Sequence, residues 1–171
     1  MILSTIINTI RQNGINEELN SDYKLNIEIS NVFNVISILL TFPFILILRE
    51  TPKASILASI PILAFIASLL LIRYQQYKIG RLVFSLTTPT TIYILAALLY
   101  NDYGTDGMAV KFLLIADVML PFMVFCNKEW KMIVPILLIN LFYLVSFNYV
   151  NEILNITNIK YISYNPPNAT S

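Results

Sequence analysis

The residue most able to do chemistry in this sequence is Asp117, which stands in the middle of an apolar stretch. The stretch Lys111–Phe125 reads KFLLIADVMLPFMVF, and Asp117 is the only carboxylate in it. An acid held in such surroundings binds a proton or a cation, or hydrogen-bonds to neighbouring helices. Burial away from water favours the neutral acid over the carboxylate. We therefore expect Asp117 to be largely protonated and to face other protein segments rather than lipid.

Pro121 adds a second polar group at the same place. Proline has no N–H, so the carbonyl four residues earlier loses its helical hydrogen bond, and that carbonyl belongs to Asp117. Neither group can be left without a partner in hydrocarbon. A central acid costs about 2.5–3.5 kcal/mol and each apolar neighbour returns about 0.3–0.6 kcal/mol, so this stretch can still insert into a membrane.

Polar side chains in other apolar stretches fall at a similar depth. If each stretch is centred in a bilayer, four of the five midpoints lie at or near a polar residue: Thr41, Thr91, Asp117 and Asn140. Polar residues at this depth usually face the interior of a helix bundle. We interpret these four residues as an intramembrane polar cluster, which either holds the helices together or binds an ion.

Prolines recur in the apolar stretches and are expected to kink helices. Pro43, Pro61, Pro89 and Pro121 lie inside them, whereas Pro135 falls in an expected first turn, where proline is tolerated. Hydroxyl residues surround Pro89 in SLTTPTT. Their side chains can bond freed carbonyls within the same helix, or can bond across to another helix.

Most catalytic and binding chemistries lack their residues in this sequence. Histidine is absent and Cys126 is the only cysteine, so we expect no metal and no redox pair. Nucleotide-binding loops and hydrolase motifs are also missing, and we expect neither a cofactor nor enzymatic activity. A net charge of +1 gives no basic face for nucleic acid.

The elements that position these residues are membrane spans. The chain is 57% hydrophobic and 12% charged, with a mean hydropathy of +0.70, whereas globular proteins are roughly 45–50% apolar and about 25% charged. Uncharged runs of nearly 20 residues suit a hydrocarbon core of about 30 Å. We predict an all-α integral membrane protein, a bundle of five spans at about 31–48, 54–72, 82–100, 108–126 and 132–150.

The segments outside the spans differ in character, which divides the chain into residues 1–30, 31–153 and 154–171. In MILSTIINTIRQNG, isoleucine and leucine recur at helical spacing, which predicts an amphipathic helix on the membrane surface. A signal peptide is the alternative, but Arg11 follows the apolar residues instead of preceding them. Residues 154–171 form a polar tail that contains Pro166 and Pro167.

Basic residues predict the orientation, because cytoplasmic loops carry more Lys and Arg. With the N-terminus inside, seven basic residues fall on the inner side and four on the outer side. The inner ones are Arg11, Lys24, Arg73, Lys78, Arg81, Lys128 and Lys131, and the outer ones are Arg49, Lys53, Lys111 and Lys160. This distribution favours an internal N-terminus and an external tail.

Four stretches carry a resemblance to a known group of proteins: NGINEEL, KLNIEISNVFNVISILLTF, RYQQYKIGRLVFSLTT and CNKEWKMIVPILLINLFYLV. Their order is similar to the multi-span N-terminal region of bacterial membrane-bound sensor histidine kinases and class III nucleotide cyclases. The resemblance covers most of the chain but rests on loose, hydrophobic motifs. It implies a sixth span and a cytoplasmic effector after Ser171, both absent from this sequence. It transfers no catalytic residue.

These observations predict a membrane sensory or anchoring module of a bacterial signal-transduction protein, located in the inner membrane. Expected partners are the lipid bilayer and the missing effector, and the bundle also allows a homodimer. One alternative is a small transporter or proton-conducting protein that uses Asp117. Another is a membrane scaffold subunit in which Asp117 only holds helices together.

Overall fold

The computed structural model describes the backbone of residues 2–47, 52–103 and 107–164, and most of the side chains within them. Every regular element in these ranges is helical. The helices are α1 (Ile2–Arg11), α2 (Ser21–Ile47), α3 (Pro52–Arg73), α4 (Tyr77–Tyr103), α5 (Gly107–Val118), α6 (Leu120–Val124) and α7 (Trp130–Tyr164), with a 3₁₀ turn at Asn127–Glu129 before α7.

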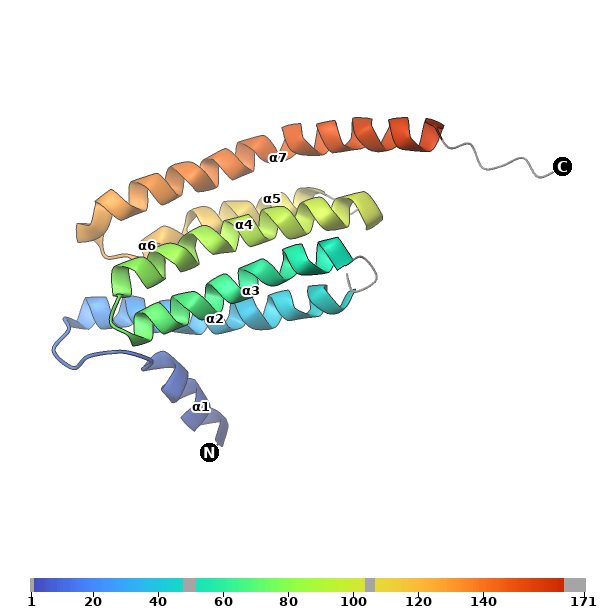
Figure 1. Ribbon diagram of the computed structural model, residues 1–171. Coiled ribbons are helices and arrows are strands. Elements are labelled where there is room, and N and C mark those ends of the chain that lie inside the picture. The colour runs from blue at the N-terminus through green and yellow to red at the C-terminus, as the bar shows by residue number, and fades with distance from the viewer. Residues whose placement is uncertain (1, 48–51, 104–106, 165–171) are drawn as a thin grey trace.

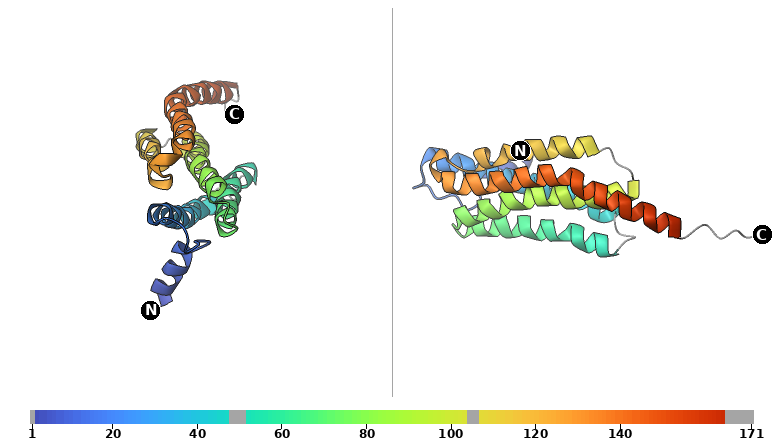
Figure 2. Two further views of the ribbon diagram at one scale, coloured as in Figure 1. Left: turned by 90° about the vertical axis from the view of Figure 1, so that its left-hand side faces the viewer. Right: turned by 90° about the horizontal axis from the view of Figure 1, so that it is seen from above.

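The long helices run side by side in an elongated bundle (Figure 1). Helix α4 is central, because it packs against α2, α3, α5, α6 and α7. The N-terminal segment, the α3–α4 turn and the α6–α7 turn gather at one end, which we call the N-terminal end. Helix α1 projects sideways from that end, and α7 extends past the other helices at the opposite end (Figure 2).

Four helices in the described part of the chain are long and apolar enough to cross a membrane. Their apolar stretches are Ser21–Ile47, Ser55–Arg73, Tyr77–Ala96 and Asn127–Phe147. The distribution of polarity also fits a lipid environment, because large apolar side chains such as Leu39, Leu63 and Phe142 are about two-thirds exposed. Water-soluble proteins rarely expose such extensive apolar surface. The chain is therefore an all-helical protein of multi-pass membrane type.

The expected span at 108–126 is not continuous. Helix α5 ends at Val118, Met119 forms a turn, and α6 begins at Leu120 with Pro121 in its first turn. Neither piece is long enough alone to be a candidate span. The proline ring and the missing N–H explain the interruption. The helices continue through Pro43, Pro61 and Pro89.

Helix ends also differ from the predicted boundaries. Helix α2 begins at Ser21, ten residues earlier than the first expected span, because the Asn20 side chain accepts a hydrogen bond of 3.2 Å from the N–H of Asp22. Helix α7 begins at Trp130 and runs to Tyr164, so it includes much of the predicted tail. Pro135 consequently lies inside α7 rather than in its first turn.

Two turns fix the N-terminal end of the bundle. Gly14 has a φ of +74°, and a Cβ atom at this position would lie 2.3 Å from the carbonyl oxygen of Ile72. Only glycine permits this approach to the end of α3. Gln75 adopts a φ of +62° in the tight turn between α3 and α4. The N-terminal segment is therefore held directly against the α3–α4 turn.

Candidate functional site

Asp117 lies in the last turn of α5, beside the interruption between α5 and α6. Only 6% of the residue is exposed, so it faces the bundle interior and not lipid. Its Oδ2 atom is buried and has no hydrogen-bond partner among the described residues. The neighbouring core is apolar, with Leu114 one turn before and Pro121 one turn after. Asp117 is therefore a buried acid whose Oδ2 atom can still accept or donate a hydrogen bond.

Asn140 of α7 supplies the hydrogen-bond donor that Pro121 lacks. Its Nδ2 atom donates a hydrogen bond of 3.0 Å to the backbone carbonyl of Asp117. Asn140 is 1% exposed, and its own Oδ1 atom is buried without a partner in the described structure. The contact joins α7 to the break in α5–α6. Two members of the predicted polar cluster are thus brought together, through a side chain and a backbone carbonyl.

The other two predicted members, Thr41 and Thr91, do not join this contact. Both are buried, at 4% and 5% exposure. Each hydroxyl donates a 2.7 Å hydrogen bond within its own helix, Thr41 to the carbonyl of Ser37 and Thr91 to that of Thr87. Their hydroxyl protons are therefore already used locally. Similar predicted depth therefore does not bring all four side chains together.

The hydroxyl residues around Pro89 have mixed roles. Thr87, Thr88 and Thr91 bond carbonyls one turn earlier, but none of these is the Ser85 carbonyl that Pro89 leaves free. Thr90 also lies 3.1 Å from the hydroxyl of Tyr143 in α7. The region thus combines internal helix contacts with one contact between helices.

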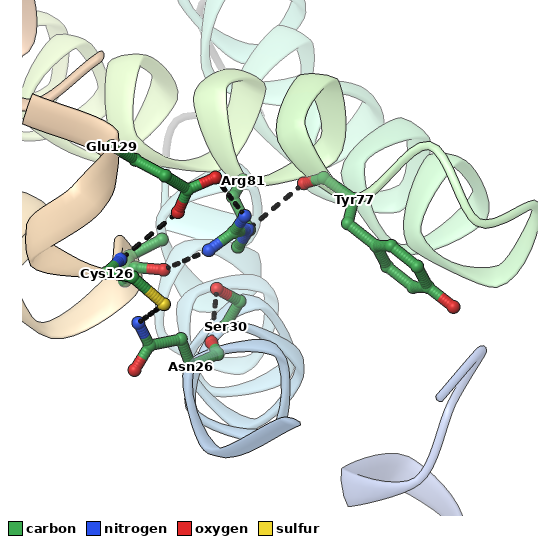
Figure 3. Close-up of polar contacts among 7 residues, drawn as sticks. Asn26, Ser30, Tyr77, Arg81, Cys126 and Glu129 are labelled. Carbon is green, nitrogen blue, oxygen red and sulfur yellow. Dashed lines mark hydrogen bonds and ion pairs between the residues drawn. The ribbon is translucent and has the colours of Figure 1, made fainter. Parts of the chain in front are cut away.

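A second polar site, at the N-terminal end, centres on Arg81 of α4. We call Arg81, Glu129, Cys126, Asn26 and Tyr23 the Arg81 cluster (Figure 3 shows all of these except Tyr23). Arg81 is fully buried, and its Nη2 atom lies 2.9 Å from Oε1 of Glu129. The guanidinium also lies 4.3 Å from the centre of the Tyr23 ring, at cation–π distance.

Arg81 also donates to two backbone carbonyls. Its Nη1 atom bonds the carbonyl of Val124, the last residue of α6, at 2.9 Å. Its Nε atom bonds the carbonyl of Tyr77, one turn earlier in α4, at 3.2 Å. A buried guanidinium is tolerated only when it is paired and its donors are used. The pattern fixes α6 and the start of α7 against α4.

Cys126 and Glu129 close the turn between α6 and α7. The carboxylate of Glu129 accepts a hydrogen bond of 3.1 Å from the N–H of Cys126. The Cys126 sulfur accepts one of 3.2 Å from Asn26 of α2. Cys126 lies between the helices, and burial together with the nearby Glu129 carboxylate raises the pKa of its thiol. The cysteine therefore serves the packing of the turn as a neutral thiol.

A third set of contacts attaches the N-terminal segment to the bundle. The hydroxyl of Tyr77 donates a 2.6 Å hydrogen bond to the carbonyl of Gly14. Asn31 of α2 donates to the carbonyls of Arg11 and Asn13, at 3.1 and 3.0 Å. Arg11 also forms an ion pair with Glu28 of α2. The part of the predicted segment 1–30 that precedes α2 is thus tied to the bundle by specific bonds.

The Arg81 cluster was not predicted from the sequence, which favoured Arg81 as a charge of the inner loop. The structure corrects this interpretation, since Arg81 lies in the second turn of α4 and is paired. One signal could have revealed the pair. Arg81 and Glu129 have opposite charges and lie at ends of apolar stretches that meet on the same side of the membrane in an alternating topology.

Comparison of the chain with protein families, with characterised proteins and with solved structures found no match. Within the described residues, no group of three or more Cys, Asp or Glu side chains could hold a metal ion. The interpretation of the site therefore depends on its own geometry: a secluded acid at a helix break, and a buried ion pair at one end.

Proposed function

We propose that this chain is the membrane sensory or anchoring module of a bacterial signal-transduction protein. In this proposal the protein crosses the inner membrane five times, with α5 and α6 together making the fourth crossing. The N-terminal end faces the cytoplasm, and α1 lies on the membrane surface. The basic residues at that end and the apolar outer surface support this placement.

The observation that carries the proposal is the position of α6 between the two polar sites. One end of this five-residue helix adjoins the break at Asp117, and the carbonyl of Val124 at its other end accepts a hydrogen bond from Arg81. A short helix has few internal hydrogen bonds of its own. Movement at the break would therefore displace the Val124 carbonyl relative to Arg81.

The Arg81 cluster would pass such a movement to the N-terminal end. Arg81 contacts Glu129 in the 3₁₀ turn just before α7, and Tyr23 near the start of α2. A change in protonation or packing at Asp117 would thus reach two further helices through one guanidinium. A buried, fully paired group suits this role, because it switches between discrete arrangements and does not deform gradually. The resemblance supplies the proposed recipient, a cytoplasmic effector beyond a sixth span.

Trp130 provides a direct test. It is the only tryptophan in the chain, it begins α7, and it follows Glu129. The fluorescence of Trp130 should change with pH in the parent protein in lipid vesicles and should lose that change in Asp117→Asn. Asp22→Asn is the control, because Asp22 is an exposed acid at the start of α2. A pH response that survives in Asp117→Asn would refute the coupling.

The orientation has its own test. A variant that keeps Lys78 as its one reactive lysine is reconstituted in sealed vesicles. A lysine-directed reagent should label this variant from the cytoplasmic side and not from the external side, because Lys78 is exposed at the N-terminal end. Labelling from the external side would reverse the proposed topology.

A small proton-conducting or ion-transporting protein is the second candidate function. The break between α5 and α6 and the unpartnered Oδ2 atom of Asp117 favour it, because transporters often place binding sites at interrupted helices near the membrane midplane. Proton flux into proteoliposomes distinguishes the two. A flux that Asp117→Asn abolishes would support transport, whereas the sensory proposal expects no flux above that of empty vesicles.

A further inference from the structure

A groove opens where α1 leaves the bundle. It has a volume of about 310 Å³ and is lined by side chains from α1, α2 and α3 and by Asn13, which follows α1. Its apolar part includes Ile10, Val35, Ile66 and Leu70, and Arg73 lies at the end of α3. This volume is at the lower end of the range for small-molecule sites.

Specific contacts close the groove at the C-terminal end of α1. Asn13 Nδ2 donates a 3.1 Å hydrogen bond to the carbonyl of Leu69, which fixes the C-terminal end of α1 against α3. Gly14 lies against Ile72 just beyond. The N-terminus of α1 points away from the bundle (Figure 1). The groove is therefore a wedge between α1 and the long helices.

The lining changes from apolar to cationic along α3. Ile66 and Arg73 are seven residues apart, which is about 10 Å along a helix axis. Arg73 is exposed, and it forms no ion pair with any residue that the structure describes. Thr9 also lines the groove, and its hydroxyl already donates a hydrogen bond to the carbonyl of Thr5. The groove thus joins an apolar floor to a positive charge that has no ion-pair partner among the described residues.

We propose that this groove binds an anionic phospholipid of the cytoplasmic leaflet. One acyl chain lies along Ile66 and Leu70, and the phosphate pairs with Arg73. The depth of the groove in the membrane fits a phospholipid. Arg73, at the end of α3, lies at the level of the headgroups, and the apolar floor continues from there toward the hydrocarbon. The charge also fits, since a guanidinium suits a phosphate better than a lone ammonium does. The inference rests on the membrane placement proposed above and not on signalling.

Lipid retention tests the charge. The full chain is reconstituted in vesicles of equal phosphatidylglycerol and phosphatidylcholine, extracted in mild detergent, and its co-purified lipids are quantified. Phosphatidylglycerol should be enriched, and Arg73→Gln should lower the enrichment about fivefold, because the bound phosphate loses its guanidinium partner. Lys78→Gln is the matched control, because Lys78 is an exposed cation at the same end outside the groove. Equal enrichment in the two variants would overturn the assignment of Arg73.

A second pair of variants tests the acyl site. Ile66→Trp places a large ring in the groove and should reduce the retention of phosphatidylglycerol, whereas Leu63→Trp should not. Leu63 is also exposed on α3 but does not line the groove. Parent-like retention by Ile66→Trp would exclude the acyl site. If these variants give the negative results but Lys78 is still labelled from the cytoplasmic side, only the proposed lipid site is refuted. External labelling would instead remove the proposed orientation.

Discussion

Replacing Glu129 removes the carboxylate that pairs with Arg81. Arg81 is fully buried, and the side chain of Glu129 is 12% exposed, so solvent screens the pair weakly. Removing one partner of a buried ion pair costs about 3–5 kcal/mol, because the remaining charge is left uncompensated. We expect Glu129→Ala to lower the free energy of unfolding by this amount. Glu129→Gln retains an acceptor and should cost about 1.5–3 kcal/mol.

The chain contains a matched control for this experiment. Arg11 and Glu28 also form an ion pair, but their side chains are 48% and 24% exposed. A pair that is this open to solvent contributes about 0–1 kcal/mol. Glu28→Ala and Glu28→Gln should therefore change stability far less than the same substitutions at Glu129.

Denaturation in mixed micelles measures these differences, with Trp130 fluorescence and circular dichroism as independent probes. The single variant Arg81→Met and the double variant Arg81→Met with Glu129→Gln complete a double-mutant cycle. The double variant should be more stable than the sum of the two single losses predicts, because it leaves no unpaired buried charge. If Glu129→Ala costs no more than Glu28→Ala, or if the double variant shows no coupling, the pair does not stabilise the N-terminal end as argued.

Three further predictions concern single positions. Asp117→Asn should keep the fold, because it mimics the neutral acid. Asp117→Leu should lower the free energy of unfolding by about 0.6–2 kcal/mol. If the Leu variant is as stable as the parent, Asp117 has no role in helix association. Gly14→Ala should release the N-terminal segment from Ile72, because its φ is positive and a Cβ would meet a backbone oxygen; faster proteolysis near residue 14 reports this release, and unchanged proteolysis would argue against it. Cys126 should react with iodoacetamide at pH 8 more slowly in the folded chain than in the denatured chain, because its raised pKa keeps the thiol protonated; equal rates would show an ordinary thiol.

Local sequence patterns predicted much of the helical architecture. Length and hydropathy are properties of a contiguous segment, so the four candidate membrane helices could be found without knowledge of their neighbours. The same local chemistry predicted that Pro121 would free the carbonyl of Asp117. It did not predict that the span would break into α5 and α6, because many helices in membranes tolerate proline.

Tertiary structure alone decided which polar groups meet. Asn140 bonds Asp117 across 23 residues, and Arg81 pairs with Glu129 across 48 residues. Thr41 and Thr91 have a similar predicted depth but bond within their own helices. Lipid is as apolar as leucine, so hydrophobicity drives a helix into the membrane but does not select the face that contacts another helix. That selection depends on packing and on the partners of buried polar groups, which lie far apart in the chain.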